Sequence, residues 1–314
     1  MTKLRVYAPK ESLDHKGFPY FSERPARFEE LLQLFKDLEI EISTSSSRQV
    51  RENVELAHSR PYVDFVQKVS QMDLVRATFT NWTNKFVQCY TRISPGSYNA
   101  ALSATGAVCQ AVDDVLTDKA KRGFCAVRPP GHHAGPVRGE GFCIFNNVAI
   151  GALYALKQGL KRVAIIDFDR HHGNGTEDIV LFEGKEKVFF VSSFQEGCKY
   201  ASLGPLDEVF SLRVPIPQKS DFAVVRELYL QKVVPALEQF KPELLLLSAG
   251  FDMHVADPLT NLRLEASDYG ALTDILVSIA DKHCNGRIVS VLEGGYELAA
   301  LRECVKEHLQ ALAQ

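Results

Sequence analysis

Short runs of apolar residues alternate along the chain with segments whose apolar side chains recur every three or four positions. The continuous runs predict strands buried on both faces, and the longer spacing predicts amphipathic helices. Predicted strands cover residues 4–8, 124–127, 163–167, 188–192, 244–248 and 288–292. Predicted helices cover residues 61–69, 100–116, 147–158, 222–240, 266–283 and 298–312, and another follows Ser22 as its N-cap and continues to Leu38.

From residue 124 onward the predicted strands and helices mostly alternate. This order is typical of an α/β protein with a mostly parallel sheet and helices on both faces. We find no internal repeat, low-complexity tract or linker, so we expect one domain over residues 1–314. Ser45 to Ser47 predict a surface turn. Residues 72–96 lack a clear period, which predicts a long loop of the kind that is often functional.

The composition narrows the class of protein. The 314 residues are 46% hydrophobic and 24% charged, with a formal charge of -3, so nothing suggests a nucleic-acid partner. Seven scattered cysteines without a CxxC pair favour a reducing compartment over a disulfide framework. No apolar run approaches the ~18 residues of a transmembrane helix, and residues 1–20 lack the apolar core of a signal peptide. We therefore expect a cytoplasmic or nucleocytoplasmic protein with no membrane partner, of unpredicted oligomeric state.

Charged side chains begin where the predicted strand 163–167 ends. Asp167, Asp169 and His171 are spaced by two, so an extended chain would point all three to one side. Two carboxylates and an imidazole are costly to bury together without a divalent cation. For a single aspartate, a helix N-cap or an ion pair would be the better interpretation, and that alternative stays open. His58 has no such neighbours, which favours a structural histidine with satisfied hydrogen bonds.

Three other predicted strands end in sequences of the same kind, RPPGHH at 128–133, SAGFD at 248–252 and EGGY at 293–296. The carboxyl ends of parallel strands share one edge of a sheet, which is where open α/β sheets bind ligands. We therefore expect four more side chains at that edge: His132, His133, Asp252 and Tyr296.

This set of side chains supports one class of reaction. Asp169, His171 and Asp252 would give three metal ligands without a thiolate and leave a position open, as catalytic zinc sites do. A metal acidifies bound water, a nearby imidazole can take the proton, and Tyr296 can donate to a developing oxyanion. The sequence thus indicates metal-assisted hydrolysis of an amide.

The same motifs resemble the histone deacetylase family, in its class II and bacterial amidohydrolase branch. GFCIFNNVA at 141–149 and DPL at 257–259 add to the four strand ends, and the similarity covers nearly the whole chain. The resemblance implies the arginase/deacetylase α/β fold, one catalytic zinc ion, and removal of acetyl groups from lysine in a peptide or protein, histones included.

The resemblance also implies ion ligands and catalytic roles, position by position. The residues that match the zinc ligands are Asp169, His171 and Asp252. Those that match ligands of a structural potassium ion are Asp167, Asp169, His171 and Ser192. The catalytic set comprises the paired general base and acid, the partner of each, and the residue that polarises the acetyl carbonyl: His132, His133, Asp167, Asn174 and Tyr296. Class I members carry aspartate where this chain has Asn174, so His133 should be a weaker base than one backed by a carboxylate.

A narrow tunnel for the lysine methylenes is the last feature that the resemblance implies. Gly141 and Phe142 match one wall, and Tyr200 is our candidate for the other, although GCKYASLG at 197–204 departs from the family pattern. Leu259 matches a position at the tunnel mouth. Arg170 replaces a usual apolar residue and should point away from the metal by strand parity.

Three alternatives remain. A binuclear manganese ureohydrolase of the same fold would need DAHxD and DxD patterns, whereas His254 stands where its second aspartate would be. An acetylpolyamine hydrolase would tend to carry glutamate in place of Leu259. A non-catalytic, protein-binding relative would be expected to have lost a ligand or the tyrosine, and this chain has lost neither.

Overall fold

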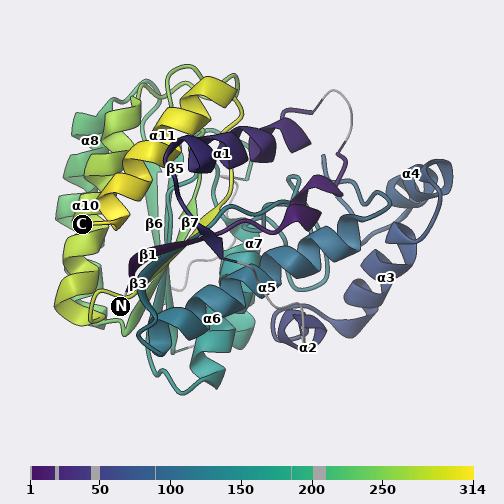
Figure 1. Cartoon of the computed structure of the whole chain (residues 1–314), viewed down its shortest axis with the longest axis horizontal. Helices are drawn as coiled ribbons and strands as arrows, with labels where there is room; N and C mark the ends of the chain where they lie inside the picture. The colour runs from purple at the N-terminus through teal and green to yellow at the C-terminus, as the bar shows by residue number, and fades with distance from the viewer. Residues whose placement is uncertain (1, 18–20, 44–49, 89, 185, 201–209) are drawn as a thin grey trace.

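A computed structural model describes the chain except for residues 1, 18–20, 44–49, 89, 185 and 201–209 (Figure 1). Within the described part, eight strands form one sheet in the order β2-β1-β3-β8-β7-β4-β5-β6, and every neighbouring pair is parallel. The strands are β1 Thr2–Tyr7, β2 Ile42–Ser43, β3 Ala120–Cys125, β4 Val163–Asp167, β5 Val188–Gln195, β6 Ser211–Ile216, β7 Leu244–Ala249 and β8 Ile288–Leu292. The predicted parallel α/β sheet is therefore confirmed.

Helices cover both faces of the sheet (Figure 1). They are α1 Pro25–Asp37, α2 Val50–Val54, α3 Arg60–Ser70, α4 Leu74–Thr83, α5 Ser97–Leu116, α6 Asn147–Lys157, α7 Asn174–Glu183, α8 Phe222–Leu228, α9 Val234–Phe240, α10 Ala266–His283 and α11 Leu298–Leu312. The side chains of β4 alternate between the two helical layers. Ala164 and Ile166 pack with α1, α10 and α11 on one face. Val163 and Ile165 pack with α5 and α6 on the other face. All five β4 residues are buried, as the continuous apolar run predicts.

A third apolar cluster joins α2, α3 and α4 to α5 and α6 at one end of the molecule (Figure 1). Tyr62 and Val66 of α3 pack there against Ile144 and Phe145, which follow the tunnel-wall motif of the sequence. The Tyr62 hydroxyl donates to the carbonyl of Ile144 at 2.6 Å. This cluster therefore fixes the segment that leads from the paired histidines to α6.

The predicted loop at 72–96 is wrong, because it contains helix α4. Asp73 caps this helix by accepting from the backbone N–H groups of Val75 and Arg76. The helix buries small or polar residues, such as Ala77, and exposes Phe79 and Trp82. Its apolar side chains thus lie on the exposed face, which is why the usual amphipathic pattern does not mark it.

Other element boundaries also differ from the prediction. The N-cap of α1 is Arg24, not Ser22, and it makes no side-chain capping bond. The predicted helix 222–240 is divided by a π-type turn at Tyr229–Val233, next to Pro235, whose ring nitrogen cannot donate to the preceding turn. The serine turn at 45–47 lies outside the described residues.

The loops after β3, β4, β7 and β8 meet at one edge of the sheet, as the parallel order requires. In the ladder, Asp167 lies opposite Ser248 of β7 and Ser192 of β5. None of the helices in the described ranges is both long and apolar enough to cross a membrane.

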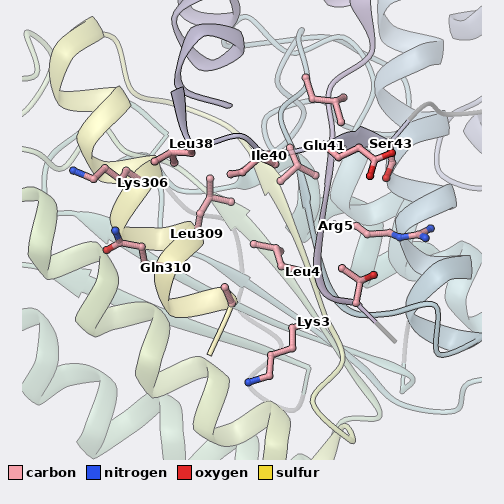
Figure 2. A pocket seen from close by; sticks show the side chains of 14 residues that line it. Lys3, Leu4, Arg5, Leu38, Ile40, Glu41, Ser43, Lys306, Leu309 and Gln310 are labelled. Carbon is pink, nitrogen blue, oxygen red and sulfur yellow. The ribbon is translucent and has the colours of Figure 1, made fainter. Parts of the chain in front are cut away.

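A cavity of about 820 Å³ lies away from that edge, between β1, the chain after α1, and the end of α11 (Figure 2). Leu4, Ile40 and Leu309 form its apolar part, and the charged ends of Lys3 and Lys306 lie at its periphery. No cluster of metal-ligand side chains among the described residues reaches this cavity.

Candidate active site

Three potential metal ligands converge at the carboxyl edge of the sheet. Asp169 and His171 lie in the turn after β4, and Asp252 lies in the turn after β7, with their ligand atoms within 4.8 Å of one another. Nδ1 of His171 is 3.0 Å from Oδ1 of Asp169 and 3.0 Å from Oδ2 of Asp252. The structure thus brings together the three residues that the sequence nominates as ligands.

The local geometry differs from the extended strand that we expected. Strand β4 ends at Asp167, and the Asp169 carboxylate accepts the backbone N–H of His171 at 2.9 Å. This turn, rather than strand parity, brings the two side chains together. Asp167 itself is directed elsewhere, because its Oδ2 accepts from Nδ1 of His132 at 2.9 Å.

The electrostatics of the cluster favour a cation. Oδ2 of Asp252 is buried and has no hydrogen-bond partner of acceptable geometry among the described residues, although Nδ1 of His171 lies 3.0 Å away. Burial lowers the pKa of His171, but Asp169 and Asp252 outweigh burial and raise it to about 9. The two carboxylates thus stabilise positive charge at Nδ1 of His171. Two carboxylates and an imidazole are donors that suit a divalent metal such as zinc.

Arg170 contacts the opposite side of the histidine ring. Its Nη1 is 2.8 Å from Nε2 of His171, and its Nε donates to Gln195 at 3.2 Å. The guanidinium therefore points away from Nδ1, in agreement with the expected direction, but it touches the ring of the candidate ligand.

The paired histidines lie side by side with different partners. Their ring centroids are 3.9 Å apart, and Nδ1 of His133 donates to Oδ1 of Asn174 at 2.7 Å. Burial lowers the pKa of His132, but the charges of Asp167 and Asp169 raise it to about 10. Burial, followed by the charges of His132 and His171, holds the pKa of His133 well below its usual value. The hydrogen bond to Asn174 raises the pKa of His133, but it does not outweigh burial and these charges.

A cavity of about 360 Å³ opens onto the cluster. Its lining includes His133, His171 and Tyr296, together with the four residues nominated for substrate binding: Gly141, Phe142, Tyr200 and Leu259. The rings of Tyr200 and His133 are 4.1 Å apart, and those of Phe142 and Tyr296 are 5.9 Å apart. The structure therefore brings together residues that are separated by most of the chain.

Gly141 is required by the close approach of this wall to the histidine pair. Its φ of 54° is a left-handed conformation, and a Cβ at this position would collide with the ring of His133. The next residue, Phe142, also has positive φ, at 69°. The backbone here is thus shaped to place the Phe142 ring against the cavity.

The sequence did not identify three residues that hold the catalytic side chains. Glu293 accepts the backbone N–H groups of Gly131 and His132 at 2.7 and 3.1 Å, which fixes the turn that carries the histidines. Arg27 donates to the carbonyls of Glu293 and Gly295, both at 2.6 Å, and its guanidinium lies 5.0 Å from the ring centre of Tyr296. Asp257 accepts the N–H of Tyr296 at 2.7 Å. Only the quoted motifs EGGY and DPL could have drawn attention to Glu293 and Asp257.

Tyr296 has the properties of a hydrogen-bond donor. It is buried and lines the cavity, and burial, followed by the charges of Asp252 and Asp169, holds its pKa well above the usual value. Its hydroxyl therefore keeps its proton at neutral pH.

The residues nominated as potassium ligands are neighbours in the structure, but their side chains have different partners. Ser192 is opposite Asp167 in the ladder, while its hydroxyl lies 2.9 Å from Nδ1 of His172. The metal-ligand clusters among the described residues do not include this set.

Comparison with known proteins gives the family. The histone deacetylase domain family matches residues 21–312. Type-2 histone deacetylase 2 of Dictyostelium discoideum is 42% identical over 248 residues, which are 71% of this chain and 14% of that protein. The histone deacetylase-like amidohydrolase of Pseudomonas aeruginosa is 36% identical over 221 residues, 68% of this chain and 57% of that protein.

A solved structure extends the similarity to the whole fold. The crystal structure of the HDA15 HD domain matches with a TM-score of 0.86 and 28% identity, over 100% of this chain and 90% of that one. The predicted arginase/deacetylase architecture is therefore confirmed. Together, the family match and the relatives establish that the chain belongs to the histone deacetylase family and carries its amidohydrolase domain.

Proposed function

We propose that this protein is a zinc-dependent amidohydrolase that removes acetyl groups from the ε-amino group of lysine in peptides or proteins, and that residues 1–314 act as one catalytic domain. The observation that carries the proposal is the cluster of Asp169, His171 and Asp252, of which His171 lines the 360 Å³ cavity together with His133 and Tyr296. A zinc ion bound there would supply a Lewis acid and an acidified water molecule.

The two histidines are proposed to move the protons. Both present Nε2 away from their partners, because Nδ1 of His132 donates to Asp167 and Nδ1 of His133 donates to Asn174. Of the pair, His133 lines the cavity. A base at this position takes a proton from the attacking water, and an acid returns one to the lysine nitrogen as the amide bond breaks. Glu293 supports both steps by holding the backbone of the histidine turn.

Tyr296 is proposed to stabilise the developing oxyanion. Its protonated hydroxyl can donate to the acetyl oxygen, and the contacts from Arg27 and Asp257 preorganise it. Phe142 and Tyr200 offer aromatic surfaces to the apolar methylenes of the lysine side chain. This arrangement suits a long, uncharged acyl-lysine arm that ends at the metal.

A structural potassium ion near Asp167 and Ser192 and a cytoplasmic or nucleocytoplasmic location also belong to the proposal. Membership of the family supports the first. The six described cysteines, all buried and free of disulfides, support the second.

The decisive experiment is a substrate panel with defined metal content. The stripped protein is reconstituted with one equivalent of zinc or ferrous iron, or with two of manganese, and acetate release is measured from acetyl-lysine peptides, longer acyl-lysine peptides and acetylpolyamines. We expect acetyl-lysine peptides to be hydrolysed at one metal equivalent. Activity that requires two equivalents of manganese, or that is confined to acetylpolyamines, would contradict the proposal.

A further inference from the structure

One cation stands at the mouth of the substrate cavity. Lys199 is exposed and lines the cavity together with Tyr90 and Tyr200. Its ammonium lies 4.3 Å from the ring centre of Tyr90 and 5.4 Å from that of Tyr200. These contacts place the charge beside the opening, because a cation is attracted to the face of an aromatic ring.

No carboxylate among the described residues neutralises this charge. The ion pairs of the described chain do not include Lys199, and the lining residues of the cavity include no aspartate or glutamate. An ammonium has three N–H donors and no acceptor, so its ring contacts leave donors available to a ligand. Within the described part of the chain, the mouth therefore carries a positive charge suited to an anionic group.

We propose that Lys199, with Tyr90 and Tyr200, forms a subsite for an acidic side chain of the substrate, next to the acetyl-lysine in the peptide. This inference rests on the proposed deacetylation of lysine. When an acetyl-lysine fills the cavity, the adjoining peptide must lie across its mouth, since successive Cα atoms are only about 3.8 Å apart. A glutamate or aspartate in that stretch comes within reach of Lys199, whereas a lysine there is repelled.

The position of the charge separates this preference from selection of the acyl group. The acyl end of the substrate would lie at His171, the member of the metal cluster that lines the cavity, whereas Lys199 is an exposed residue of the lining. The ammonium would therefore interact with the peptide residues that flank the acetyl-lysine and not with the acyl chain. It also disfavours acetylpolyamines, whose remaining amines would lie near it without a carboxylate to pair with.

The test compares three acetyl-lysine peptides that differ only at the residues flanking the modified lysine, with Glu, Gln or Lys there. For the zinc-loaded wild type we expect kcat/KM to fall in the order Glu, Gln, Lys, by about two- to fivefold per step, as for exposed ion pairs. The differences should reside in KM, because a contact remote from the reacting bond is equally strong before and in the transition state. They should shrink in about 1 M salt, where the screening length is about 3 Å.

Two variants and one control assign the effect to this residue. Lys199→Gln should bring the ratios between peptides close to one, and Lys199→Glu should reverse their order. Lys232→Gln removes the same charge from an exposed position outside the cavity and should keep the wild-type ratios.

The outcomes separate failure of the subsite from failure of the proposed function. If all three peptides are hydrolysed at equal rates, or if Lys199→Gln keeps the wild-type ratios, the subsite is refuted and the deacetylase activity stands. If no peptide is hydrolysed and acetylpolyamines are, both are refuted.

Discussion

His58 connects the two loops that build the active site, and it can do so only while it is neutral. The ring is buried, its Nε2 accepts the backbone N–H of Asn146 at 2.9 Å, and its Nδ1 donates to the carbonyl of Gly135 at 2.9 Å. Asn146 follows the tunnel wall in the sequence, and Gly135 follows the paired histidines. The structural role expected from its isolation in the sequence is thus confirmed, and protonation of Nε2 would break one of the two bonds.

The size of the resulting acid sensitivity follows from the pKa. Burial lowers the pKa of His58 from 6.5 to about 4. Between these values the unfolded chain binds a proton that the folded protein excludes, so stability falls as the pH drops from 6.5 toward 4. At about 1.4 kcal/mol per pH unit, His58 alone should cost about 2 kcal/mol of unfolding free energy between pH 7 and pH 5, and about 3 kcal/mol by pH 4.

The measurement is urea-induced unfolding of the wild type and His58→Gln at pH 7, 6 and 5. Glutamine can accept and donate as the neutral imidazole does, but it does not titrate. Burial also lowers the pKa of His15 to about 4 and of His308 to about 3, so both proteins lose additional stability through these residues. The informative quantity is therefore the difference in pH dependence between the two proteins, which should reach about 2 kcal/mol at pH 5. Parallel stability profiles, or a His58 ring that titrates near 6.5 by NMR, would refute the reasoning.

The proposed chemistry gives three further expectations. Asp252→Ala should abolish activity and most retention of the catalytic metal in elemental analysis, whereas full activity with two manganese equivalents would contradict a single-metal site. Tyr296→Phe should lower kcat on the order of 10²-fold at unchanged metal content, as loss of one oxyanion donor does, and an active variant would require another donor. Leu259→Glu should shift kcat/KM from acetyl-lysine peptides toward acetylpolyamines, less so at high salt, and wild-type preference for polyamines would show that this position does not set specificity.

Most inner strands could be predicted from the sequence, although the strand predicted at 124–127 overlaps only the last two residues of β3. The edge strands could not be predicted. The inner strands β4, β7 and β8 are buried at every residue, and most of their residues are therefore apolar. Strand β6 lies at the edge of the sheet and contains Arg213 and Pro215. An edge strand tolerates both, because one side of its ladder is unpaired and Arg213 can reach Glu177. Its sequence consequently carries no strand signal.

Helix α7 was missed for a related reason. It begins at Asn174 and Gly175, directly after Gly173, and these residues predict a turn. The chain does turn at Gly173, but the helix begins at the next residue, Asn174. The first residue of the helix, Asn174, accepts the hydrogen bond of His133, so the segment contributes to the site where the turn becomes helix.

The candidate ligands could be found because parallel strands end at one edge, but the groups that position them could not. Arg27 binds main-chain carbonyls of residues 293 and 295, more than two hundred positions away in the chain. A hydrogen bond to backbone places no demand on the identity of the partner side chain. Such contacts leave no pattern in a single sequence, so only the structure can reveal them.

The glycines of the motifs define the metal site as closely as its ligands do. A Cβ on Gly250 would overlap the Asp169 carboxylate, and one on Gly294 would lie 2.5 Å from Oδ2 of Asp169 and 2.8 Å from Oδ2 of Asp252. The backbone N–H of Gly294 instead donates to Oδ2 of Asp169 at 2.8 Å. The two carboxylates are therefore held by main chain that approaches closer than any side chain would allow. A protein that kept Asp169, His171 and Asp252 but replaced these glycines would retain the ligand types and lose the geometry that makes them a site.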